Sequence, residues 1–516
     1  MSKRPLAIAL IALGIAAAVA ILGGDKLLQP WAVRQVDAAL SQPPFTKVSH
    51  GAVTYSPWSG HLDVADLALD VSGENLRSFA AARIVVDGLT PLKLARLGSD
   101  SVKIPAMSAQ NAIWLSDDGA QFLRTETEEL HVAGVMPAEW RRAYGPASDG
   151  GGDTAPAALF DEMTASKLSV VNDDTKSTVS ALNLRLTDVK VRPGTLARGT
   201  WFDRWQTVLG GLSLGRLDVS EIRASDPGNG GNRLGIGNVT VEKLEPGTVG
   251  VLQIDTFAFS GTPGTLKVAA LELHDAAYQT SGKIPQYFVR QMHVADFQAG
   301  VKPGAEVSIK DLMLSMDGAI GKTSAVAAKI KSIIIPATAL PLLHSLDYNE
   351  IAIDYESTVA HDDARQLAET KALLAAAHAG TLGLSLRLSN YPANAFAADT
   401  GALTMGLLAA QLDRFELRYN DDSLVERLLK MGAAQTRSDV DAERERNIAI
   451  LQNWRAAVAN KPALAANYDA VIAFLRNPRT ITVTIAPPQP LPLKDIAGLF
   501  SAAPESVAER LGLSVQ

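Results

Sequence analysis

Two short motifs match patterns that carry chemistry in other proteins. Gly211-Leu212-Ser213-Leu214-Gly215 has the G-x-S-x-G spacing of a hydrolase nucleophile elbow, a turn that exposes a serine for acyl transfer. The elbow needs a strand before the serine and a helix after it. This sequence instead indicates a helix before Ser213 and the strand-like run LDVSEIRA after it. We interpret the two glycines as small residues in a helix-to-strand turn.

The second motif, Gly321-Lys322-Thr323, has the ending of a phosphate-binding loop. Met316 occupies the position five residues before Gly321, where that loop requires glycine. The following AVAAKIKSIII continues as a strand where the loop needs a helix. A turn between two strands is the simpler interpretation.

Histidines and carboxylates show no spacing suited to metal binding. The eight histidines form no H-x-H or H-x-x-x-H pair. The nearest cluster, His361-Asp362-Asp363, fits the first turn of a helix better than a ligand set. Asn172-Asp173-Asp174 and Asp117-Asp118-Gly119 lack the spacing of a calcium loop and indicate turns. The sequence therefore predicts no catalytic, cofactor-binding or metal-binding residue.

The composition narrows the class of protein. The 516-residue chain is 47% hydrophobic and 20% charged, which is enough apolar material for a folded core. Its formal net charge of -7 argues against a nucleic-acid partner. The absence of cysteine excludes disulfides, thiolate metal sites and cysteine nucleophiles, and it is compatible with an oxidising compartment such as the periplasm.

The N-terminus indicates a membrane anchor. Pro5 to Gly24 is uncharged and long enough to cross a hydrocarbon core of about 30 Å. Lys3 and Arg4 precede it, so the positive-inside rule places the start in the cytoplasm and the body outside it. The alternative is a cleaved signal peptide with an A-x-A site at Ala18-Val19-Ala20.

A strand-like pattern recurs about ten times along the body, with apolar residues at i, i+2, i+5 and i+7. Copies begin at Leu62, Leu184, Leu217, Leu234, Leu252, Leu266, Met292, Val307 and Ala328, with a partial copy from Leu412 to Leu417. Each half of the pattern alternates as a half-buried strand does, and a β-bulge or tight turn must restore the apolar face in the middle. The spacing of the copies is too short for crossover helices and predicts an antiparallel meander.

Other stretches have a helical period. We expect helices at 200–211 and at about 362–378. A third helical region, with helices at 422–431, 439–459 and 462–475, should form an α-hairpin. Thr480 to Ile485 then alternates as a strand, and the proline-rich PPQPLPLKDI should leave the ladder.

The expected fold class is mainly β with α segments (α+β). It combines an N-terminal transmembrane helix, a long curved antiparallel sheet and a C-terminal helical hairpin. The expected domains are the anchor at 1–25, the β-rich body at 26–421, and 422–516 with the hairpin, a terminal strand and C-terminal helices. Flexible joints, or merely long hairpin loops, are expected near 147–154 and 226–232.

The anchor, the stretch Gly51-AVTYSPWSGHLDVADLALDV and the recurrent LxVxxLxL strands together resemble the AsmA-like and YdgA-like bacterial envelope proteins. The resemblance is architectural, and it leaves the helical segment from Asp422 to Leu475 outside the family pattern. It implies a curved sheet with an apolar groove, anchored in the bacterial inner membrane and associated with lipid traffic.

These observations favour a non-enzymatic, membrane-anchored periplasmic scaffold or partner-binding protein. The first alternative is an AsmA-like lipid-contacting or lipid-transfer protein, with residues such as Leu252, Ile254, Leu266 and Val268 lining an open apolar face. The second is an enzyme whose site no motif reveals. The expected partners are the inner membrane and either phospholipid or envelope proteins.

Overall fold

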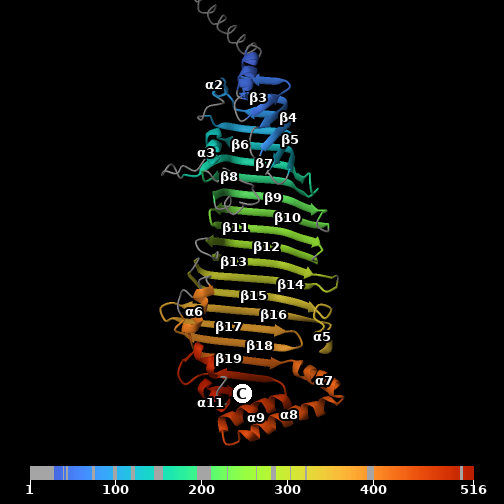
Figure 1. Cartoon of the computed structure of the whole chain (residues 1–516), viewed down its shortest axis with the longest axis vertical. Coiled ribbons are helices and arrows are strands. Elements are labelled where there is room, and N and C mark those ends of the chain that lie inside the picture. The colour runs from blue at the N-terminus through green and yellow to red at the C-terminus, as the bar shows by residue number, and fades with distance from the viewer. Residues whose placement is uncertain are drawn as a thin grey trace, which may run out of the picture. The chain divides into compact units, whose positions relative to one another are not determined.

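The computed structural model describes residues 28–38, 40–41, 45–71, 76–96, 102–117, 122–144, 155–193, 211–228, 231–262, 264–279, 286–302, 304–319, 322–391, 400–499 and 504–516. The chain divides into two compact units, residues 1–262 and 263–516. The body expected at 26–421 is thus shared between them. Each unit is mainly β and is built on an antiparallel sheet (Figure 1).

Unit 1 is a meander of strands with few helices. Its strands are β1 (Phe45–Ser49), β2 (Val53–Ser56), β3 (His61–Val71), β4 (Leu76–Asp87), β5 (Ile104–Asp117), β6 (Phe122–Val135), β7 (Ala157–Asn172), β8 (Thr178–Val191), β9 (Leu212–Asp226), β10 (Asn232–Glu245) and β11 (Thr248–Gly261). β1 and β2 both pair with β3, and from β3 to β11 each strand pairs with the next. The described helices are at 28–38, α2 (Pro91–Ala95) and α3 (Pro137–Tyr144).

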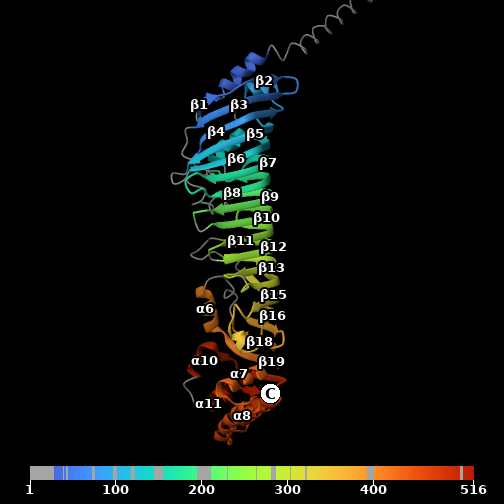
Figure 2. The same cartoon turned by 90° about the vertical axis from the view of Figure 1, so that its right-hand side faces the viewer.

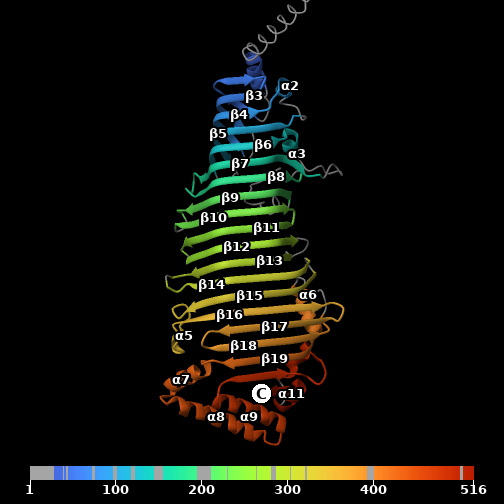
Figure 3. The ribbon, with the colours of Figure 1, turned by 180° about the vertical axis from the view of Figure 1, so that it is seen from behind.

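Unit 2 continues the same design and ends in helices (Figure 3). Its strands are β12 (Gly264–Gln279), β13 (Gln286–Gly300), β14 (Val307–Ala319), β15 (Lys322–Pro336), β16 (Glu350–Asp362), β17 (Leu367–Ala376), β18 (Gly380–Ser389), β19 (Gln411–Asp421), β20 (Thr480–Ile485), β21 (Leu491–Pro492) and β22 (Leu513–Val515). Its described helices are α5 (Leu342–Ser345), α6 (Thr400–Ala409), α7 (Leu424–Thr436), α8 (Val440–Ala457), α9 (Pro462–Arg476), α10 (Leu493–Leu499) and α11 (Pro504–Leu511). β12 to β19 pair in order, β20 and β21 both pair with β19, and β22 pairs with β20. The predicted antiparallel meander is confirmed within each unit.

In six of the nine full copies of the repeated strand pattern a left-handed residue lies at the slip in the middle. The fifth residue of six copies has a positive φ, between 47° and 57°: Asp66, Asp188, Glu221, Thr256, Asp296 and Ser332. Around Asp66 the register with β4 is unchanged, because Ala65 pairs with Arg83 and Leu67 with Ala81. At Asp66 the device is therefore a kink without an extra residue, whereas around Ser332 the register between β15 and β16 shifts by one residue.

The kink returns the apolar residues on its two sides to the same face of the sheet. In β3 all four apolar positions, Leu62, Val64, Leu67 and Leu69, are buried in one cluster although strict alternation would separate the pairs. Aspartate and asparagine tolerate the left-handed region better than most residues. This accounts for the polar residue in the middle of many copies.

The kinks form lines across unit 1. The registers align Asp66, Ala82, Asn111, Glu128, Lys167, Leu182, Glu221, Gly237 and Thr256. Along this line φ is positive on every second strand, from β3 to β11. The residue aligned with each kink on the neighbouring strand therefore has no positive φ.

One predicted helix is wrong. Residues 362–378 form the end of β16, a turn and β17, whose residues pair with β16 on one side and β18 on the other. The alanine-rich segment has good helix formers, but two neighbouring strands satisfy its backbone groups, and this tertiary pairing overrides local propensity.

The C-terminal α-hairpin is confirmed, with α8 packed against α9, and so is the strand at Thr480–Ile485. The proline-rich segment does not leave the sheet entirely, because Leu491 and Pro492 pair with β19. The expected joint near 226–232 is the loop between β9 and β10.

Three sequence predictions fall outside the described residues: the apolar segment 5–24, the helix at 200–210 and the joint at 147–154. In the described ranges no helix is both long enough and apolar enough to span a bilayer.

Gly134 gives a test of the kinked sheet. Its φ is +72°, and a Cβ added there would lie 2.1 Å from Oδ2 of Asp161 on β7. Gly134→Ala should destabilise the protein by about 1–3 kcal/mol, measured as a lower urea midpoint. Gly235→Ala is the matched control, since its added Cβ meets nothing within 4 Å. Equal midpoints for the two variants would contradict this account.

Candidate functional site: an uncovered apolar sheet face

Large apolar side chains form a row across the sheet of unit 2. Each member is the direct ladder partner of the next, from β12 to β20. The row consists of Leu271, Val294, Leu312, Ile330, Tyr355, Leu374, Leu382, Tyr419 and Ile481. A parallel row runs through Leu273, Met292, Leu314, Ala328, Ser357, Ala372, Leu384, Leu417 and Val483.

Among the described residues, no packed second layer covers the central strands of this face. From Leu271 to Leu374 every member of the first row is only half-buried, and Leu382 is 37% exposed. None of them belongs to a buried cluster. The main helix–strand contacts in the described part of unit 2 join α9 to β20 and β22, α10 to β21, and α11 to β22. At one end of β15–β17 this face is packed, because Leu343 of α5 and Leu424 and Met431 of α7 lie in one cluster with Ile335, Ile351 and Ala376. Among the described residues, the row from Leu271 to Leu374 lies outside that packing.

Unit 1 has an equivalent row, and part of it is covered. It consists of Val64, Ile84, Ala109, Leu130, Ala165, Leu184, Val219, Val239 and Ile254. Ala32 and Val36 of the helix at 28–38 are buried in the same cluster as Val64, and Figure 2 shows this helix beside β1–β3. α3 packs on β7. From β8 to β11 the row is half-buried.

The residues named from sequence as lining such a face lie on these strands. Leu252 and Ile254 are half-buried in β11 of unit 1, and Leu266 and Val268 are half-buried in β12 of unit 2. None of the four belongs to a buried cluster. The fully packed core that would argue against lipid contact is not found at these positions.

Polar contacts hold the covering helix at 28–38 in place. Gln29 donates to the carbonyl of Val53 and accepts from the backbone N–H of Tyr55 at 2.8 Å. Farther along the helix, Asp37 Oδ1 lies 2.8 Å from Nε2 of His50. The hydrogen bond to Asp37, with a second to the carbonyl of Gly51, raises the pKa of His50 above its usual 6.5.

The opposite face of each sheet carries charges in pairs. In unit 1, Arg83 of β4 contacts Asp63 of β3 at 2.6 Å, and this hydrogen bond lowers the pKa of Asp63. In unit 2, Nζ of Lys331 lies 2.8 Å from Asp354, whose pKa is lowered by that contact and by the backbone N–H of Ser332. Such cross-strand pairs on an exposed face contribute little stability but keep the face hydrated.

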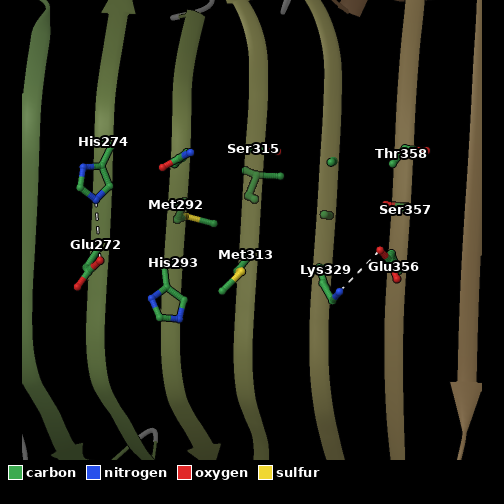
Figure 4. A pocket seen from close by; sticks show the side chains of 14 residues that line it. Glu272, His274, Met292, His293, Met313, Ser315, Lys329, Glu356, Ser357 and Thr358 are labelled. Atoms are coloured by element: carbon green, nitrogen blue, oxygen red, sulfur yellow. Dashed lines mark ion pairs between the residues drawn. The ribbon is translucent and has the colours of Figure 1, made fainter.

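A hollow of about 420 Å³ lies over β12–β16 of unit 2 (Figure 4). On the polar face it is lined by a ladder row consisting of Glu272, His293, Met313, Lys329 and Glu356. His293 Nε2 lies 2.6 Å from Asp311, while Glu272 is 3.9 Å from His274 and Lys329 is 3.9 Å from Glu356. In the part of the chain that the structure describes, no group of three His, Asp or Glu side chains is placed to hold a metal ion.

The sequence motifs lie in ordinary structural positions. Ser213 is a strand residue of β9, opposite Lys190 of β8. Lys322 and Thr323 begin β15 and pair with Ala319 and Gly318 of β14, so the strand-to-strand interpretation is confirmed. Neither motif has the strand–turn–helix context that its chemistry needs.

His361-Asp362-Asp363 is also structural, although it ends a strand and does not begin a helix. The His361 side chain is 1% exposed, and its Nε2 lies 2.9 Å from the carbonyl oxygen of Tyr391. Asp362 accepts from the backbone N–H groups of Ala364 and Arg365, as an aspartate in a turn does. Asn172 makes the same kind of turn with Asp174 and Thr175, as predicted.

Comparison with known proteins matches the C-terminal part of the chain to one family model. A family model described as "Uncharacterized protein" matches residues 373–516, which run from within β17 through the helical hairpin to β22. No curated protein matches the chain.

The attachment of the helix at 28–38 should depend on pH. Because folding raises the pKa of His50, its contribution is complete below about pH 6.5 and is lost as pH rises through the higher folded value. The urea midpoint of the wild type should exceed that of His50→Asn by more at about pH 5.5 than at about pH 8.5. Asp37→Asn should remove this pH dependence. A difference in urea midpoint between the wild type and His50→Asn that grows as pH rises would contradict the prediction.

Proposed function

We propose that the protein is a non-enzymatic, membrane-anchored envelope protein whose open apolar sheet face binds the acyl chains of lipids. The observation that carries this proposal is the half-buried row from Leu271 to Leu374 in unit 2. An uncovered apolar strip of this kind marks an interaction site in soluble regions of proteins. Every square ångström that a ligand covers contributes roughly 25 cal/mol.

The chemistry of the strip favours alkyl chains over a polar substrate. Along the row the side chains are aliphatic or aromatic, whereas the charged groups described above lie on the opposite face in ion pairs. The row also continues from strand to strand without a break, which suits an extended ligand better than a compact one.

The anchor proposal rests on the sequence. Pro5–Gly24 would hold the protein in the bacterial inner membrane with the N-terminus cytoplasmic and the body periplasmic. Cleavage after Ala20 is the alternative, and it would release the body into the periplasm. In either case the sheet would work outside the cytoplasm, beside a supply of lipid.

Photo-crosslinking in the envelope of living bacteria tests the lipid proposal on the full chain. Benzoylphenylalanine at Leu312 or Ile330 should yield covalent lipid adducts detectable by mass spectrometry, because these ladder partners lie on the apolar face. The matched controls are Met313 and Lys329, which are also direct ladder partners but lie on the other face. Adducts at all four positions, or at the control pair alone, would refute the proposal.

A scaffold that binds a protein partner is the second candidate. Large apolar side chains are exposed on the helices that follow β19: Leu428 on α7 is 44% exposed, and Ile450 and Trp454 on α8 are 41% and 56% exposed. Ile450 and Trp454 are four residues apart and so share a helix face. The apolar patch first expected near Trp201 and Trp205 falls outside the described residues.

Crosslinking from the helical hairpin tests the scaffold. Benzoylphenylalanine at Ile450 should capture one defined protein if this face is a docking surface. Glu445 is an exposed α8 position outside the Ile450–Trp454 pair and serves as the control. The scaffold is rejected if the two positions give the same protein adducts or none.

A further inference from the structure

We propose that the tip of unit 1 formed by Trp58 and Leu92 sits in the surface of the lipid bilayer. Trp58 is 62% exposed in the turn between β2 and β3, and Leu92 is 63% exposed on α2. Both are large apolar side chains projecting from the described body of the unit. The inference rests on the proposed membrane anchor and concerns a surface separate from the apolar sheet face.

Hydrogen bonds hold the two segments together. The backbone N–H of Leu89, just before α2, donates to the carbonyl of Gly60 at 2.8 Å. The hydroxyl of Tyr55, just before the turn, donates to the carbonyl of Leu89 at 2.8 Å. The turn that carries Trp58 and the segment that leads into α2 are therefore held together.

The same tip lies beside the point where the chain enters unit 1. Gln29, in the first turn of the helix at 28–38, is hydrogen-bonded to Val53 and Tyr55 of β2. The opposite part of that helix is held by Asp37 to His50, away from the turn at Trp58. The chain thus enters the unit at the Trp58 end of β2.

The reach of the chain places lipid close to this tip. The apolar segment Pro5–Gly24 ends four residues before Leu28. Four residues span at most about 14 Å even when fully extended. The bilayer surface from which the anchor emerges is therefore within reach of the Trp58 turn.

The side chains at the tip suit the interface between headgroups and acyl chains. Tryptophan is enriched at that depth because its ring is apolar and its N–H is polar. Lys93 follows Leu92 on α2, and Arg96 ends that helix, so two cations accompany the apolar pair. Long basic side chains reach back to anionic headgroups while their neighbours enter the apolar layer.

The absence of cysteine makes a direct test possible. Trp58→Cys and Leu92→Cys variants of the full chain, each labelled with the fluorophore NBD, are reconstituted into vesicles of phosphatidylcholine and phosphatidylglycerol. We expect a blue-shifted emission, loss of fluorescence with nitroxide-labelled lipids, and protection from iodide in the water. Trp454→Cys is the matched control, since Trp454 is similarly exposed at 56% but lies on α8 of unit 2. Its label should respond to iodide and not to the nitroxide lipids.

The proposal is overturned if labels at 58 and 92 are as open to iodide as the label at 454, or if nitroxide lipids quench all three equally. Failure of the full chain to float with the vesicles would remove the anchor and this proposal together. Lipid adducts at Leu312 and Ile330 are measured on another surface, so the proposed function can survive either result.

Discussion

A left-handed kink keeps the apolar side chains of a kinked strand on one face of the sheet. Without it, strict alternation would move the apolar residues after Asp66 to the face opposite Leu62 and Val64. Neither face would then be continuous. Because the kink recurs on alternate strands of unit 1 at the same register, that sheet keeps one apolar face and one charged face along its strands. The cost of a left-handed residue is limited where aspartate or asparagine occupies the position.

A continuous apolar face must be covered by protein or by a ligand. In unit 1 the helix at 28–38 and α3 cover the face near β3–β7, and the residues beneath them are buried. In unit 2 the described helices pack on β20–β22 and at the ends of β15–β17, and the central row from Leu271 to Leu374 is half-buried. The distribution of helices thus decides which part of the face is core and which part is available for binding.

The charged face of each sheet keeps that side of the protein hydrated. Cross-strand pairs such as Arg83–Asp63 and Lys331–Asp354 keep the polar face hydrated and its carboxylates ionised. The same pairing explains why the polar face offers little chemistry: its charges are satisfied by neighbours one strand away. The hollow around His293 and Met313 follows this pattern, since His293 is already bonded to Asp311.

Elements with local signals could be predicted from the amino-acid sequence. The i, i+2, i+5, i+7 pattern identified the kinked strands because alternation and its interruption are properties of a few consecutive residues. A helical period in the sequence likewise predicted the α8–α9 hairpin. The strand pattern also predicted that Leu252 and Leu266 lie on the apolar face. The error at 362–378 arose where a helix-favouring composition was overruled by pairing with β16 and β18. The identity of the ladder partners and the part of the apolar face that the described helices leave uncovered could not be predicted in this way. Register depends on hydrogen bonds between strands, and coverage depends on where distant helices pack, so neither is encoded in any short stretch of the chain.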